Sequence, residues 1–264
     1  MTYHTTQTNA SERGFTLVEL AIVMIIIGLL IGGILKGQEL IGNARVSSSV
    51  AQVKAIESGI STFRDKYAAF PGDIASASTK ISNCLSTTAC GTTPTSGVLA
   101  NGVIEAAGSV QNPGVLSTTV DEVGVAFLQM GAAGVIGGVQ SNAAAGGLVA
   151  GTTNPVIPVG GSWVIGSSTG AAATGMIDVS GLAAGVYIAS SPNPAAAIPT
   201  GDIQVMTPVQ AANIDRKIDD GQPNTGIVRA IGNAAPAATT CTSAAGGYNE
   251  SLSGSLCGVY AKVQ

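Results

Sequence analysis

Hydrophobic residues dominate the start of the chain, in one run from Phe15 to Leu35 whose only ionisable residue is Glu19. At about 1.5 Å of rise per residue, a helix of this length is about 31 Å long, which matches the roughly 30 Å hydrocarbon core of a bilayer. The run therefore predicts a helix that spans a membrane.

Beyond this run, the hydrophobic positions take the spacing of a half-buried helix. Apolar residues recur at three- and four-residue steps, at Val46, Val50, Val53, Ile56, Ile60, Phe63 and Tyr67. The opposite face carries Lys54, Glu57, Ser61, Arg64 and Asp65. Because Pro71-Gly72-Asp73 breaks helices, the pattern predicts one helix from about Thr16 to Ala69, roughly 80 Å long.

The remaining residues, 71–264, suffice for one globular domain. A capping-box pattern, Thr119-x-x-Glu122, predicts one short helix, and Thr207-Pro208 predicts the start of a second. An antiparallel sheet is predicted from extended segments at residues 155–165, 176–179, 185–189, 202–206, 226–231 and 259–263. The expected fold class is α+β, with the long N-terminal transmembrane helix packed on an antiparallel-sheet globular head, in the shape of a lollipop.

Charged residues are scarce in this head. No lysine or arginine lies between Lys80 and Arg216, and the whole chain has a formal net charge of −4. Weak repulsion between copies suits close packing of subunits, although drift towards small residues would leave the same composition. Because nucleic-acid binding needs a basic patch, we expect no nucleic-acid partner. The only histidine is His4, and no nucleophile or phosphate-loop motif is present, so we expect no enzymatic activity.

Glu19 is the residue that needs explaining, because a carboxylate in lipid costs on the order of 3 kcal/mol and usually has a partner. In the uncut chain it has no evident partner. A cut between Gly14 and Phe15 would free an amino group four residues upstream, on the same helical face. The sequence Gly14-Phe15-Thr16-Leu17-Val18-Glu19 resembles the type III signal of type IV prepilins and type II secretion pseudopilins. Large pilin-like proteins also have segments similar to residues 63–67, 71–73 and 213–221.

The resemblance implies a processing step and a cellular location. Residues 1–14 would be a cytoplasmic leader, 15–35 the transmembrane half of the long helix, 36–70 its exported amphipathic half, and 71–264 the globular head. Prepilin peptidase would cut between Gly14 and Phe15 and methylate Phe15, and Glu19 would pair with the terminal amine of a neighbouring subunit. The subunit would wait in inner-membrane lipid with its head in the periplasm. An inner-membrane assembly platform would then extract it into a filament of identical or related pilin subunits, in the periplasm or at the cell surface.

Two functions of this class stay open, a type IV pilus subunit and a pseudopilin of a type II secretion system. Many filament-forming relatives have a proline near the end of the membrane segment, where this chain has Lys36, and that difference favours a pseudopilin or minor subunit. The leader has only a weak positive bias, because Arg13 follows Glu12. The alternative is a soluble exported binding protein with an ordinary signal peptide, cut after Ala44.

Four cysteines form two local pairs in the sequence, Cys84 with Cys90 and Cys241 with Cys257. An even number in an exported domain favours disulfides, and we expect the local pairing because short separations close most readily. Zinc is the competing use, but neither pair has the two-to-four-residue spacing of a zinc knuckle.

Three carboxylates, Asp215, Asp219 and Asp220, lie near the end of the second predicted helix. Anions at a helix C-terminus are unfavourable with the helix dipole, so a cation should offset them. Calcium is one candidate, although the spacing differs from that of an EF-hand, and no other cofactor is expected. The other candidates are the nearby basic side chains of Arg216, Lys217 and Arg229.

Overall fold

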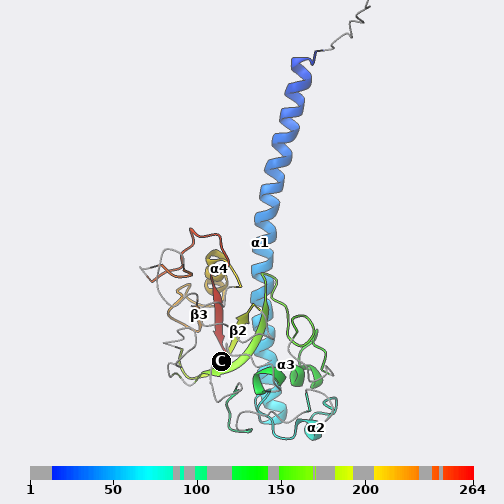
Figure 1. Cartoon of the computed structure of the whole chain (residues 1–264), viewed down its shortest axis with the longest axis vertical. Helices are drawn as coiled ribbons and strands as arrows, with labels where there is room; N and C mark the ends of the chain where they lie inside the picture. Colours follow the sequence, from blue (N-terminus) through cyan, green and yellow to red (C-terminus); the bar gives the residue numbers. More distant parts are fainter. Residues whose placement is uncertain are drawn as a thin grey trace, which may run out of the picture. The chain divides into compact units, whose positions relative to one another are not determined.

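The computed structural model describes residues 14–85, 90–91, 99–105, 121–141, 149–168, 170, 182–192, 205–231, 240–243 and 246–264. The chain divides into two compact units, Met1–Ala44 and Arg45–Gln264. The second unit, called the head below, contains the sheet and every helix except the first part of α1 (Figure 1).

Helix α1 (Leu17–Tyr67) is 51 residues long, as the sequence predicts to within two residues. In its first part the apolar side chains are exposed, Leu29 for example at 74 %. Among the described residues, α1 is the one helix long and apolar enough to cross a bilayer, by length and composition. The first part of α1 therefore has no apolar partner of its own and fits the predicted membrane segment.

From Arg45 onwards, α1 is part of the head and buries one face. Its fully buried side chains include Ile56, Ile60 and Phe63, all members of the predicted apolar stripe. Helix α3 (Glu122–Ala132) lies beside the last turns of α1 (Figure 1), and a Cβ on Gly59 would stand 2.8 Å from Cε of Met130. Gly59 therefore leaves room for the end of the Met130 side chain.

The helix ends in a tight turn that docks on α3. Ala68 has φ +54, and Pro71-Gly72-Asp73 follows, where the sequence predicts the break. Gly72 has φ +95, and a Cβ there would stand 2.2 Å from the backbone oxygen of Glu122. Only glycine fits this position, because a side chain would be both strained and in collision with α3.

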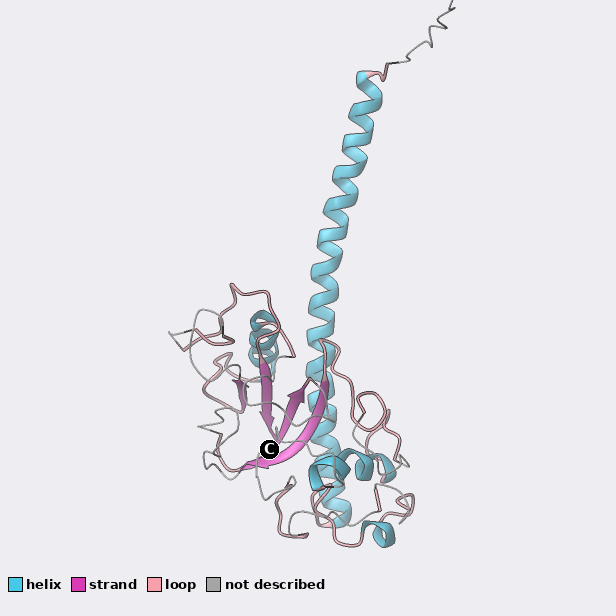
Figure 2. Ribbon diagram, in the orientation of Figure 1, coloured by secondary structure: helices cyan, strands magenta, loops and turns pink. Residues whose placement is uncertain are grey.

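The sheet is antiparallel, with strand order β1-β2-β4-β3 (Figure 2). Its strands are β1 (Ser162–Ser168), β2 (Gly185–Ser191), β3 (Val228–Ile231) and β4 (Gly258–Lys262). Trp163 and Tyr260 from the sheet are fully buried in the core, together with Phe127 from α3. The Trp163 indole nitrogen donates a 3.0 Å hydrogen bond to Oε1 of Gln52, which joins the sheet to α1. Long helix and antiparallel sheet together make the α+β fold that the sequence predicts.

One predicted strand is wrong in detail. The sequence predicts a single strand over residues 155–165, but the chain turns back at Gly160 and Gly161, so that β1 begins only at Ser162. The segment before the turn lies against β1 through an isolated bridge between Val156 and Ser162. Predicted strand 176–179 and most of 202–206 lie outside the described residues, and Met206 forms an isolated bridge with Cys257.

The short helices confirm both predicted sites but change one cap. Helix α4 (Pro208–Ile218) has a capping box between Thr207 and Gln210. Helix α3 is capped by Asp121, whose Oδ1 accepts a 2.7 Å hydrogen bond from the Gly124 nitrogen. The predicted cap, Thr119, lies outside the described residues and is two positions too early. The sequence analysis did not predict α2 (Ala77–Lys80).

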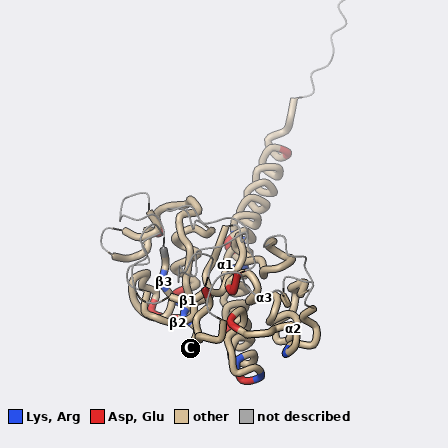
Figure 3. The backbone as a smooth tube through the Cα atoms, turned by 60° about the horizontal axis from the view of Figure 1, so that its bottom comes forward, with Lys and Arg blue, Asp and Glu red and all other residues tan. Residues whose placement is uncertain are grey.

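Two disulfides join Cys84 to Cys90 and Cys241 to Cys257, which is the local pairing. All four cysteines are buried. Charged residues are sparse along the described parts of the head, where most of the backbone tube is tan (Figure 3).

Candidate functional site

The predicted cleavage position in the N-terminal segment is exposed to solvent. Gly14 and Phe15 precede the first residue of α1 and are exposed, Phe15 at 87 %. Glu19, four residues after Phe15, lies in the first turn of the helix. The bond between Gly14 and Phe15 thus lies before the first residue of α1.

Glu19 has a hydrogen-bond partner within its own chain, Thr16, and it forms no ion pair with any of the described residues. Its Oε2 accepts hydrogen bonds from the Thr16 nitrogen (3.0 Å) and the Thr16 hydroxyl (2.9 Å). In return, the Glu19 nitrogen donates to Thr16 Oγ1 at 3.3 Å. This reciprocal arrangement is a capping box, and the spacing Thr-x-x-Glu in the sequence is the signal that could have predicted it.

Only one of the two carboxylate oxygens of Glu19 accepts hydrogen bonds from the described residues. Both bonds from Thr16 end on Oε2, and Oε1 of Glu19 has no hydrogen-bond partner among the described residues. The three ion pairs of the described residues lie elsewhere, between Lys36 and Glu39, Lys54 and Glu57, and Arg216 and Glu250. Within the described part of the chain, one carboxylate oxygen of Glu19 thus accepts no hydrogen bond.

The glycines of the membrane segment also face outwards. A Cβ on Gly28 or Gly32 would meet nothing within 4 Å, and the same holds for Gly33 and Gly37. Nothing in the described part of this chain requires their small size. Glycines four residues apart let another helix approach closely in a membrane.

The structure brings together the three predicted metal ligands, Asp215, Asp219 and Asp220. One carboxylate oxygen from each lies within 4.8 Å of the others. Each carboxylate also accepts hydrogen bonds from neutral groups. Asp215 accepts one from the Tyr248 hydroxyl at 2.7 Å, and Asp219 accepts one from the Val228 nitrogen at 3.1 Å. Calcium binding at this cluster stays a prediction.

Among the described residues no ion pair joins this cluster to Arg216, Lys217 or Arg229, although the hydroxyl of Thr225 and, to a smaller extent, the charge of Arg229 lower the pKa of Asp220. Arg216 pairs instead with Glu250, and Lys217 donates a 2.6 Å hydrogen bond to the hydroxyl of Ser47 on α1. Backbone N–H groups and hydroxyls donate hydrogen bonds to all three carboxylates. Burial raises the pKa of Asp215 to about 6, although its bonds from Tyr248 and Gly221 oppose this shift.

A second group of carboxyls, which the sequence analysis missed, lies where the Gly72 turn meets α3. Asp73, Glu105, Asp121 and Glu122 are all buried there. Oε2 of Glu122 accepts a 2.7 Å hydrogen bond from the Glu105 nitrogen, whereas Oε1 is buried without a hydrogen-bond partner. Burial, with added repulsion from the nearby acids, raises the pKa of Glu122 to about 8. Glu122 is therefore mostly protonated at neutral pH.

Comparison with known proteins identifies the N-terminal segment. Residues 9–35 match the family model described as the prokaryotic N-terminal methylation motif. No curated protein and no solved structure matches the chain. The matched residues contain Gly14, Phe15 and Glu19 together with the whole apolar run. The chain thus carries the N-terminal methylation motif that is the signal of type IV prepilins and pseudopilins.

Proposed function

We propose that this protein is a structural subunit of a type IV pilus-like filament or of a type II secretion pseudopilus. Prepilin peptidase cuts it between Gly14 and Phe15 and methylates Phe15. The subunit is held in the inner membrane by the first part of α1, with its head in the periplasm, until an assembly platform extracts it. The observation that carries this proposal is the methylation motif at residues 9–35.

The exposed apolar surface of α1 supports assembly through this helix. Burial of apolar area is the main driving force for association, yet side chains such as Leu29 and Ile31 pack on nothing in the described chain. Lipid covers them before assembly, and the helices of neighbouring subunits cover them in the filament. Gly28 and Gly32 then allow the close approach of a neighbouring helix.

Glu19 sets the position of one subunit against the next. Its capping box with Thr16 orients the carboxylate at the start of α1 and leaves Oε1 open. Cleavage creates a positive amine at Phe15, and the amine of a neighbouring subunit donates to Oε1. An ion pair in an apolar surrounding is weakened far less by solvent than one in water, so it favours a single axial stagger.

The role is mechanical, and it requires neither catalysis nor a cofactor. A head with few charges has little repulsion between copies, which suits close packing along a filament. No specific observation favours the soluble exported binding protein, and α1 continues as a helix through Ala44, where that alternative places the cut.

The test is the mature N-terminus of the membrane-extracted protein, determined by mass spectrometry. A first peptide beginning with methylated Phe15 is expected. A chain that begins at Arg45, or an intact Met1, would remove the amine assigned to Glu19 and contradict the proposal. Shearing cells and probing the sheared fraction for the protein then separates a surface pilus from a periplasmic pseudopilus.

A further inference from the structure

The head contains a cavity of about 440 Å³ between the end of α1, the end of β1 and the start of β2. Among the described residues that line it, Arg64 is the one with an ionisable side chain. Phe70, Val103, Val186 and Val263 supply apolar walls. The cavity therefore combines an apolar body with one fixed positive group, which is the usual composition of a small-ligand site.

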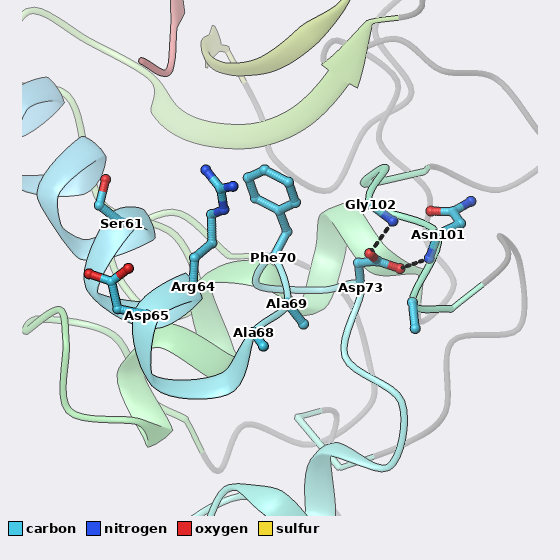
Figure 4. Close-up of a pocket in the computed structure, with 10 residues that line it drawn as sticks. Ser61, Arg64, Asp65, Ala68, Ala69, Phe70, Asp73, Asn101 and Gly102 are labelled. Carbon is cyan, nitrogen blue, oxygen red and sulfur yellow. Dashed lines mark hydrogen bonds between the residues drawn. The ribbon is translucent and has the colours of Figure 1, made fainter.

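Arg64 is exposed and held in place by an aromatic ring. Its guanidinium carbon lies 4.4 Å from the centroid of Phe70, and Figure 4 shows the two side chains next to each other. None of the ion pairs among the described residues involves Arg64. A stacked guanidinium keeps its N–H groups free for a planar anion.

Arg64 also lines a second, neighbouring cavity, whose lining residues include acids. The neighbouring cavity, about 610 Å³ and drawn in Figure 4, is lined by Asp65 and Asp73 as well. There the Asp73 carboxylate is turned to the backbone nitrogens of Asn101 and Gly102, at 3.1 and 2.7 Å. An anion is repelled by the acids of that cavity, whereas no acid lines the smaller one. An anionic group that contacts Arg64 is therefore favoured on the smaller side.

Further donors surround the smaller cavity. Ser167 and Ser168 line it, are almost fully buried, and accept hydrogen bonds from the nitrogens of Ile104 and Gly170. Neither hydroxyl donates a hydrogen bond to another residue in the described part of the chain. A second cation stands at the rim: Nζ of Lys262 lies 3.4 Å from where a Cβ on Gly185 would be.

We propose that this cavity binds the C-terminal carboxylate of a peptide whose last residue is small and apolar. The carboxylate forms a two-bond contact with Arg64 and accepts from the serine hydroxyls, while the last side chain packs on the valines. Lys262 adds long-range attraction. The inference goes beyond the filament role and does not depend on it, because every residue involved lies in the head.

Binding is tested with the full-length protein in detergent micelles and the probe N-acetyl-Gly-Ala-Val. Calorimetric titration should show at least tenfold tighter binding of the free carboxylate than of the C-terminal amide. The preference should shrink in high salt, because part of it is electrostatic. Equal affinity for the acid and the amide, or no binding of either, would overturn the proposal.

Substitutions locate the site. Arg64→Gln should abolish the preference for the carboxylate, and Arg64→Lys should keep only part of it, because an ammonium lacks the planar pair of donors. Ala184→Leu should fill the cavity and weaken binding of both probes, since Ala184 is an exposed lining residue. Lys66→Gln is the matched control: Lys66 is an exposed cation two positions away that lines neither cavity. If Lys66→Gln weakens binding as much as Arg64→Gln does, the preference is due to general charge and the proposal fails.

Discussion

The two parts of α1 show the same helix in opposite surroundings. Before Arg45, its apolar side chains are exposed, Leu29 at 74 %, whereas Ile60 in the second part is fully buried in the head. The first part is almost continuously apolar up to Leu35, whereas the second has an apolar stripe opposite a charged face, so the hydrophobic pattern already separates them. The difference is where the partner lies. The head supplies it for the second part, whereas the described residues supply none for the first, which under the proposed function is covered by lipid or by another subunit.

Two carboxyl groups at the starts of helices, Glu19 in α1 and Glu122 in α3, also differ in their burial. Glu19 in the first turn of α1 is exposed in the isolated chain and caps the helix through Thr16. Glu122 opens α3, is fully buried, and has its pKa raised by that burial. A carboxylate near a helix N-terminus is favourable in both places because of the helix dipole. Its charge state and its task depend on what the rest of the molecule places around it.

The largest expected effect is on assembly, through the charge of Glu19. Glu19→Ala removes the cap and the charge, whereas Glu19→Gln removes only the charge, because glutamine also forms capping boxes. Under the proposed function, both variants should be processed normally but should yield no filaments in electron micrographs of sheared material. Neither should change the denaturant midpoint of the head, since Glu19 belongs to the first unit.

Glu39→Gln is the control for this experiment. Glu39 is an exposed acid in the same part of α1, paired with Lys36 outside the methylation motif. It should assemble like the wild type. Normal filaments from Glu19→Gln would mean that capping, and not an ion pair between subunits, is what Glu19 contributes.

Loss of the disulfide between Cys241 and Cys257 should give the largest effect on the head itself. The chain-entropy model gives about 3 kcal/mol for a loop of this length and about 2 kcal/mol for the shorter one between Cys84 and Cys90. The longer loop also carries Tyr248, whose hydroxyl bonds to Asp215. Double Cys→Ala variants, unfolded with denaturant in micelles, measure both values. Equal destabilisation by the two pairs would show that loop length is not the deciding factor.

Glu122 should make the head less stable as pH rises. Its pKa lies near 4.5 in the unfolded chain and at about 8 in the folded one, so the folded state binds the extra proton between these values. The stabilisation is complete below about pH 4.5 and is lost by about pH 8. Asp215, raised to about 6, acts in the same direction but only up to that pH. Between pH 6 and 8, the expected loss is on the order of 2 kcal/mol.

Glu122→Gln isolates this effect, since the amide cannot ionise and its oxygen can still accept from the Glu105 nitrogen. Denaturant midpoints measured from pH 5 to 9 should become nearly flat above pH 6 in the variant. Asp215→Asn, the matched change in the other acidic group, should leave the slope between pH 6 and 8 in place. A wild-type midpoint that stays constant from pH 6 to 8 contradicts the raised pKa of Glu122.

Local signals in the sequence account for the helices and for part of the sheet. The apolar periodicity predicts α1 to within two residues, and Thr207-Pro208 predicts the start of α4, because both signals act over one or two helical turns. The sequence predicts one strand over residues 155–165 because most of these residues favour β structure. The turn at Gly160 and Gly161 interrupts that strand in the structure.

The residues of the candidate site also fall into two groups: those that a local sequence motif predicts and those that depend on long-range contacts. Gly14, Phe15 and Glu19 form a contiguous motif, so the sequence alone could point to them. The buried state of Glu122 depends on the Gly72 turn and on the Glu105 nitrogen, which come from distant parts of the chain. Likewise, the neutral donors that bond to Asp219 come from Ile227 and from Val228 at the start of β3. Periodicity and spacing carry no information on such long-range contacts.

The smallest expected effect comes from substituting the two threonines that cap helices, Thr207 and Thr16. Thr207 caps α4, where the Thr207 nitrogen donates to Gln210 Oε1 at 2.9 Å, and Thr16 caps α1 with Glu19 in the same role. Because α4 packs into the head, Thr207→Ala should destabilise the head by about 1 kcal/mol, while Thr207→Ser keeps the cap and most of the stability. Thr16→Ala should leave the unfolding of the head unchanged, because α1 begins in a separate unit, and should instead reduce assembly by freeing the Glu19 side chain. Thermal unfolding followed by circular dichroism separates the cases, with a shift of about 3 °C expected for Thr207→Ala alone. An equal shift for Thr16→Ala would show that the two parts of α1 unfold together, and that the contrast between them is one of exposure and not of stability.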